Sequence, residues 1–178
     1  MNWHSGAMDL LTLNLHRPLR WDAWQADEAG IHTTEQALAA ALAAPEDAEI
    51  VLVWDWHDIV DDASPDGPKV RRPVAAPKLT AAAGLHSPSP EQVASRSDAM
   101  ELAAGRYLFV QTRPSGNPAI DAAGLPDLFE WFAREAWWSR SPCDGPFVLR
   151  LVREDNDTAL QLIRHLSGPA TPALPVFS

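Results

Sequence analysis

The sequence predicts an α/β (or α+β) protein with a single-layer mixed, mostly parallel sheet of four to five strands. Three to four helices are expected to cover this sheet, and a long proline-rich loop to interrupt it. The 178 residues, 46% of them hydrophobic, fit a single domain spanning 1–178. Short apolar runs alternate along the chain with stretches of helical periodicity, as in proteins whose parallel strands are joined by helices. An unbroken apolar run at 50–54 is typical of a strand buried on both faces.

Local sequence patterns predict the N-terminal elements. Leucines alternate with polar residues towards the end of 8–15, which predicts a strand. The segment 20–29 precedes a glycine and is expected to be a short helix. A firmer helix begins at the Thr33 and Gln36 capping box and is stopped by Pro45.

The centre of the chain combines a buried strand with a proline-rich stretch. The apolar run at 50–54 is expected to be the central strand, followed at once by an acidic loop. Six prolines and few large apolar residues mark 63–90, for which we expect a mobile loop. A second capping box at Ser89 and Gln92 predicts a helix that ends before Gly105.

The C-terminal third contains the clearest helix. The residues 107–111 and 147–151 read as strands, and the helix is expected to begin at Pro126, near its first position, and to run to about residue 139. The segment 158–166 fits either a hairpin strand or a short helix, and the strand is preferred. Three prolines in 168–178 predict a loose tail.

If the strands are parallel, polar residues at their C-terminal ends meet at one edge of the sheet. On an extended chain Asp55 and His57 point to the same side, and with Asp58 they form a ligand set for a divalent metal such as Mg²⁺, Mn²⁺ or Zn²⁺. Such a metal would activate water, and Arg113 could stabilise an oxyanion. The alternative is that these side chains only solvate the end of the strand.

The predicted helix at 126–139 carries tryptophans outside its core-facing side. The core stripe consists of Leu125, Leu128, Phe129, Phe132 and Ala136. Trp131 and Trp138 point 120° or more away from it, by the roughly 100° per residue of a helix, with Arg134 between them. Exposed tryptophans and arginines are typical anchors of protein interfaces, so all three are candidate partner-binding residues. The alternative is that the proline-rich loop covers the rings.

Charge is unevenly distributed. The segment 1–62 has 12 acidic against 2 basic residues and accounts for the net charge of −10 of the whole chain. This balance disfavours direct nucleic-acid binding. It is explained either by solubility alone or by a surface that binds a basic protein partner. The chain has no apolar run of membrane-spanning length and no basic, apolar leader after Met1, so we expect a cytoplasmic protein without a membrane contact. Met8, where the first pattern starts, is an alternative translation start.

The sequence lacks the motifs of several common enzyme classes. A single cysteine, Cys143, excludes an internal disulfide, and the sequence has no Gly-x-Ser-x-Gly, Walker or dinucleotide-binding motif. We therefore expect a non-catalytic accessory or adaptor protein without cofactor, which binds a protein partner, or a second copy of itself, through tryptophans and the acidic N-terminal third. The alternative is a small metal-dependent hydrolase using the aspartate and histidine set after the central strand.

Overall fold

The computed structural model describes residues 9–23, 32–43, 48–61, 65–72, 74–75, 77–83, 100–154 and 157–167. In this part of the chain the helices are α1 (Thr34–Ala43), α2 (Trp56–Ile59) and α4 (Pro118–Trp138). The strands are β1 (Leu11–Leu15), β2 (Leu19–Ala23), β3 (Ala48–Trp54), β4 (Val60–Asp61), β5 (Lys69–Val70), β6 (Lys78–Ala83), β7 (Met100–Leu102), β8 (Gly105–Thr112), β9 (Cys143–Glu154) and β10 (Asp157–Leu166). None of these helices is both long enough and apolar enough to cross a membrane.

Eight of the described strands form one sheet in the order β1-β8-β10-β9-β3-β6-β2-β7, and β4 and β5 form a separate pair. Every pairing among the described strands is antiparallel. The predicted mostly parallel sheet under three to four helices is therefore wrong. The apolar run in β3 does reflect burial on both faces, but burial does not determine strand direction.

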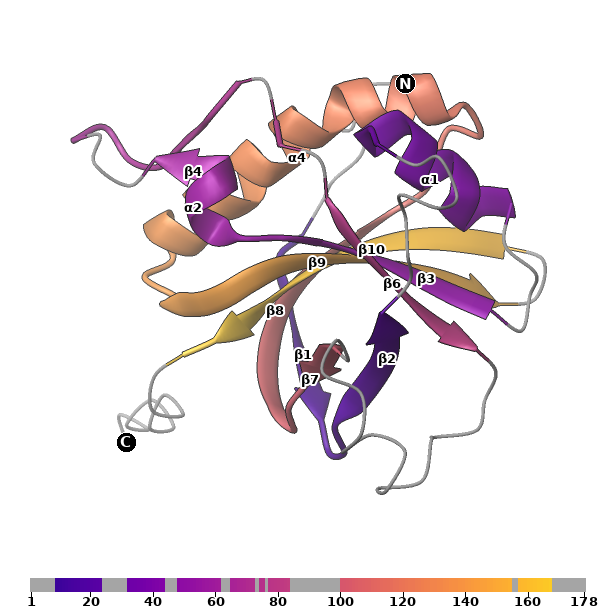
Figure 1. Ribbon diagram of the computed structural model, residues 1–178. Coiled ribbons are helices and arrows are strands. Elements are labelled where there is room, and N and C mark those ends of the chain that lie inside the picture. Colours follow the sequence, from indigo (N-terminus) through magenta and orange to yellow (C-terminus); the bar gives the residue numbers. More distant parts are fainter. Residues whose placement is uncertain are drawn as a thin grey trace.

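The sheet is strongly curled. Residues 16–18 alone connect β1 to β2, and 103–104 connect β7 to β8, although β1 and β7 end the strand order on opposite sides. Such short links span only about 10 Å, so the two ends of the sheet must lie close together, as Figure 1 shows. The inner face buries a second, smaller core: Val51, Val53, Leu102, Tyr107, Val148 and Ile163.

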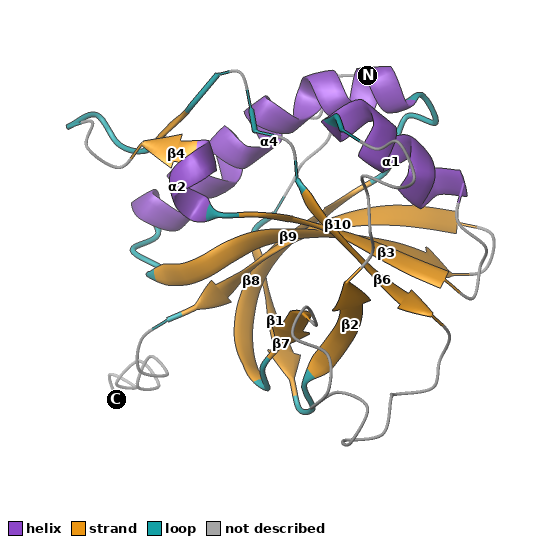
Figure 2. Cartoon of the chain, in the orientation of Figure 1, coloured by secondary structure: helices purple, strands orange, loops and turns teal. Residues whose placement is uncertain are grey.

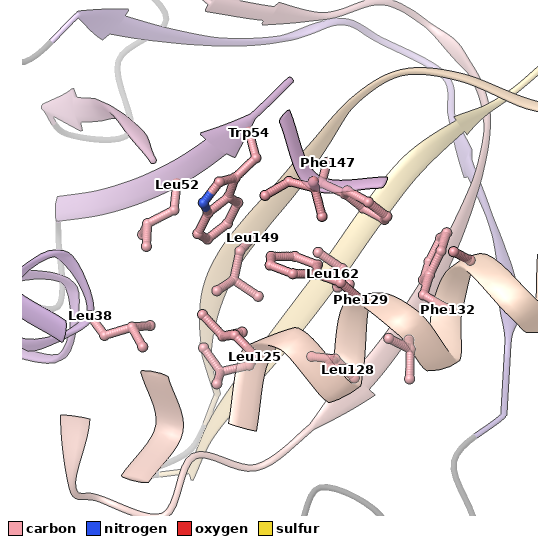
Figure 3. Packing of buried hydrophobic residues seen from close by; sticks show 14 of the residues in the cluster. Leu38, Leu52, Trp54, Leu125, Leu128, Phe129, Phe132, Phe147, Leu149 and Leu162 are labelled. Atoms are coloured by element: carbon pink, nitrogen blue, oxygen red, sulfur yellow. The ribbon is translucent and has the colours of Figure 1, made fainter. Parts of the chain in front are cut away.

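The main core lies between the sheet and the two longer helices. Figure 2 shows α1 and α4 side by side on the face of the sheet opposite β1, β2 and β7. Large side chains from both layers meet there, including Trp54, Phe129 and Phe147, with Trp54 and Phe129 in an edge-to-face contact at 5.0 Å between ring centroids (Figure 3). The predicted core stripe of α4 is fully buried or nearly so, as its periodicity indicated.

Several element predictions are confirmed. The capping box at the start of α1 forms in both directions, with Gln36 N donating to Thr33 Oγ1 at 3.1 Å and Thr33 N to Gln36 Oε1 at 3.2 Å. The strand predictions at 50–54 and 107–111 correspond to β3 and β8. The segment 158–166 forms the second strand of a long hairpin, as preferred.

Other element predictions are wrong. The segment 20–23 belongs to strand β2 rather than to a helix, and 100–102 forms strand β7. Residues 24–29 of the first predicted helix and 89–99 of the second lie outside the described residues. These short strands pair with residues far along the chain, which local patterns do not report. Helix α4 begins at Pro118 instead of Pro126, because Asn117 caps it by accepting a bond from Ala119 N at 3.0 Å.

The proline-rich stretch contains regular structure. Within 63–90, β5 pairs with β4, and β6 pairs with β2 and β3 in the main sheet, so the stretch is not simply a loop. The indole Nε1 of Trp54 donates to the carbonyl of Ala75 at 2.9 Å, which fastens the segment before β6 to the core. The predicted tail at 168–178 lies outside the described residues.

Candidate functional site

The predicted metal ligands lie at a short helical turn instead of on an extended strand. Asp55 precedes α2, while His57 and Asp58 belong to it, so the alternation that would align Asp55 and His57 does not apply. The carbonyl oxygen of His57 accepts a bond from Nε of Arg71 at 3.1 Å. Among the residues that the structure describes, no group of three or more His, Cys, Asp or Glu side chains is placed to hold a metal ion.

Arg113 is not brought to this turn. Its guanidinium pairs with Asp157 at 2.9 Å, at the end of the sheet where β9 turns into β10. Thr112, which precedes Arg113, lies opposite Leu160, and Leu160 lies opposite Leu151. Arg150, next to Leu151, lies opposite Val51, so Arg113 is level with the first half of β3. Asp55 follows the other end of β3, roughly 16 Å further along at about 3.3 Å per residue. The convergence expected at one edge required parallel strands.

The aromatic residues at the C-terminal end of α4 are exposed, but they are not the predicted pair. Trp131 is partly buried against the main core, and Arg134 pairs with Glu130 at 3.2 Å. Trp138 is 73% exposed, and beside it the adjacent Trp137 is 50% exposed. The two rings stand edge to face with 5.3 Å between their centroids. The prediction named Trp138 but omitted Trp137, although at roughly 100° per residue Trp137 lies about 120° from Leu125, the same angle as Trp131.

The β4–β5 turn covers part of Trp137. A Cβ atom built on Gly67 would lie 3.4 Å from Cε3 of the indole, so the glycine backbone is packed against the ring. Arg72, just beyond this turn, pairs with Asp127 of α4 at 3.0 Å. The proline-rich stretch therefore shields one side of Trp137. It leaves Trp138, one of the two rings that the alternative interpretation expected it to cover, 73% exposed.

A cavity of about 470 Å³ lies next to these rings. The C-terminal end of α4 forms one wall of this cavity, and α2 and the β4–β5 turn form another. The start of β9 and the end of β10 form the remaining wall. Its lining residues are Trp56, Pro68, Ala133, Ala136, Trp137, Arg140, Ser141, Pro142, Cys143 and Arg164. The cavity is thus mostly apolar and aromatic, with two arginines among its lining side chains.

Arg164 forms a rigid part of this wall. The side chain is 7% exposed, and its guanidinium carbon lies 3.4 Å from the ring centroid of Trp56. Its Nε donates to the carbonyl oxygen of Gly145 at 3.0 Å. Stacking and hydrogen bonding together hold the cation and the indole in fixed positions.

Cys143 is an unreactive part of the lining. Burial raises the pKa of its thiol to about 11, an effect that the positive charge of Arg164 opposes and the negative charge of Asp144 reinforces. The thiol also donates a hydrogen bond to the carbonyl oxygen of Ser141, with 3.6 Å between the sulfur and the oxygen. Because the thiolate is the nucleophilic form, the protonated thiol is a poor nucleophile at neutral pH.

The described residues at this site thus combine an exposed aromatic pair with a mostly apolar pocket. Trp137 lines this pocket together with Arg140 and Arg164, and Trp138 stands next to Trp137. Comparisons of the sequence with protein-family models and with curated proteins find no match.

Proposed function

We propose that this protein is a non-catalytic accessory or adaptor protein that binds a protein partner through the C-terminal end of α4. The observation that carries the proposal is the exposed pair of Trp137 and Trp138 beside the cavity. Tryptophan is among the residues most enriched at the energetic centres of protein interfaces. Two adjacent exposed indoles on one helix end form an apolar patch that a partner can cover.

The energetic gain from covering Trp138 is large for one residue. A tryptophan buries about 150–250 Å² when enclosed, and apolar burial contributes roughly 25 cal/mol per Å². With nearly three quarters of Trp138 open, its enclosure by a partner is worth on the order of 3 to 5 kcal/mol. This residue is therefore the expected centre of the contact.

Charges around the patch supplement the apolar contact. Asp55 and Asp58 are exposed on either side of Trp56, which lines the cavity, and they belong to the acidic N-terminal third. In the proposal they form the secondary contact, facing basic groups of the partner. Such rim charges steer association more than they add affinity.

Site-specific photocrosslinking tests the proposal. A photoreactive phenylalanine analogue is placed at position 138 in cells that express the chain, and at Ile120 as the matched control. Ile120 is also an exposed apolar residue of α4, 42% exposed, and lies about 27 Å away along the helix axis.

The proposal predicts a discrete adduct with another protein from position 138 and none from position 120. Adducts formed only with a second copy of the chain would contradict the adaptor function and indicate a homodimer instead. Equal adduct patterns from both positions, or none from either, would contradict the proposal.

A further inference from the structure

We propose that the cavity beside Trp137 receives a segment of the protein partner in which an aspartate or glutamate stands next to a bulky apolar side chain, with Arg140 binding the carboxylate. This inference rests on the proposed function and specifies the chemistry of the partner. It starts from an unusual backbone conformation at Arg140, which lines the cavity.

Helix α4 ends in a Schellman motif. Ser141 N donates to the carbonyl of Ala136 at 2.9 Å, and Arg140 N donates to that of Trp137 at 3.2 Å. This pair of bonds requires a left-handed conformation at the residue after the C-cap, a position usually occupied by glycine. Arg140 takes it with φ of 54°, and is the one non-glycine residue with positive φ in the described part of the chain.

The conformation at Arg140 disfavours any side chain, since a Cβ atom crowds the following carbonyl there. Glycine would meet the demand of the helix end without that cost. A long cationic side chain at a strained position that lines a cavity indicates a use for the guanidinium itself. The competing structural explanation is favourable interaction of the cation with the helix C-terminus, where the last turn of α4 has no basic residue.

The chemistry of the lining specifies the ligand. Among the residues that the structure describes, the lining includes Arg140 and Arg164 but no aspartate or glutamate. Asp144, next in the chain to Cys143, hydrogen bonds to His165. An arginine binds a carboxylate through two parallel hydrogen bonds, whereas the rings of Trp56 and Trp137 provide the contact for an apolar neighbour. The pocket is open to solvent, and its volume of about 470 Å³ leaves room for both groups.

The test uses two libraries of terminally blocked hexapeptides, each with one fixed phenylalanine. The first has glutamate on both sides of the phenylalanine, and the second has glutamine there. Binding to the full chain is followed by the indole N–H signals of Trp56 and Trp137 in ¹⁵N-labelled protein, assigned with Trp56→Phe and Trp137→Phe variants.

We expect the glutamate library to shift both indole signals and to bind at least tenfold more tightly than the glutamine library. In Arg140→Gly this preference should fall to twofold or less, while the unfolding midpoint stays equal or rises. Arg140→Lys should retain charge but lose most of the preference, because an ammonium lacks the paired donors. Arg113→Gln, at the other end of the sheet, is the matched control and should leave the preference unchanged.

Equal binding of the two libraries, or binding of neither, would overturn the inference. The inference would also be overturned if the Arg140→Gly variant kept the glutamate preference and unfolded at a lower temperature. Arg140 would then only stabilise the C-terminal end of α4. Photocrosslinking at position 138 does not depend on the carboxylate. An adduct there without any glutamate preference would therefore retain the adaptor function and reject only the partner chemistry.

Discussion

Cys143 illustrates how the surroundings of one residue limit its chemistry. Its thiol pKa of about 11, against a reference value of 9.0, leaves about 100-fold less thiolate at pH 8 than in an exposed cysteine. We predict that iodoacetamide alkylates Cys143 about 100-fold more slowly at pH 8 than it alkylates the urea-unfolded chain. The native rate should keep rising up to about pH 11, and a native rate equal to the unfolded one would contradict the burial of this thiol.

The same group makes stability depend on pH in the alkaline range. Between about pH 9 and pH 11 the unfolded chain loses the thiol proton while the native protein keeps it. The unfolded state is stabilised by this ionisation, so the contribution of Cys143 to the unfolding free energy is fully present below pH 9 and is lost as pH rises. Cys143→Ser should reduce this part of the alkaline decline in urea unfolding measurements.

Gly67 has a conformational and a packing role. Its φ of +106° disfavours any side chain, and the ring of Trp137 fills the space where a Cβ would stand. We predict that Gly67→Ala lowers the unfolding free energy by about 1–2 kcal/mol and displaces the Trp137 indole N–H signal. Gly116→Ala is the control, because Gly116 has φ of +87° with open space beside it. Gly116→Ala should lower the unfolding free energy without moving the indole signal, and equal indole shifts in both variants would contradict the packing role.

The start of α4 depends on a buried carboxylate. Asp121 is buried, and both of its carboxylate oxygens accept from Ser115 N, at 2.9 and 3.2 Å. Because Asp121→Ala leaves this amide without its partner, we predict a loss of about 1–3 kcal/mol in the unfolding free energy, measured with urea. The control Asp127→Ala removes an exposed ion pair on the same helix and should cost less than about 1 kcal/mol. Similar losses in both variants would contradict the account.

Elements with complete local signals could be predicted from the sequence. The reciprocal bonds of Thr33 and Gln36 fix the start of α1, and the apolar periodicity of α4 identifies its core face. Strands β2 and β7 could not be predicted, because three residues of pairing between them leave no periodic pattern. The start of α4 was misplaced because Pro118 and Pro126 both fit the first turn of a helix, and only the bonds of Asn117 distinguish them.

At the scale of the whole molecule, strand direction decides whether a site forms. A buried apolar strand such as β3 looks the same in a parallel and an antiparallel sheet, so the sequence pattern left the direction open. In the antiparallel sheet, Arg113 and Asp55 lie at opposite ends, and the expected edge of converging polar residues does not exist. The exposed end of α4 was predictable in part, since Trp138 lies off the core stripe by helical angle alone. The cavity was not, because segments far apart in the chain enclose it.

Binding of a protein partner at the end of α4 is tested by the dissociation constant of the partner that crosslinking captures. It is measured by calorimetry for the unaltered chain, Trp138→Ala and Ile120→Ala, each with its melting temperature as a check of folding. We expect Trp138→Ala to weaken binding by at least tenfold and Ile120→Ala to change it by less than twofold. Dissociation constants within twofold of one another for all three proteins would contradict binding at this end of α4.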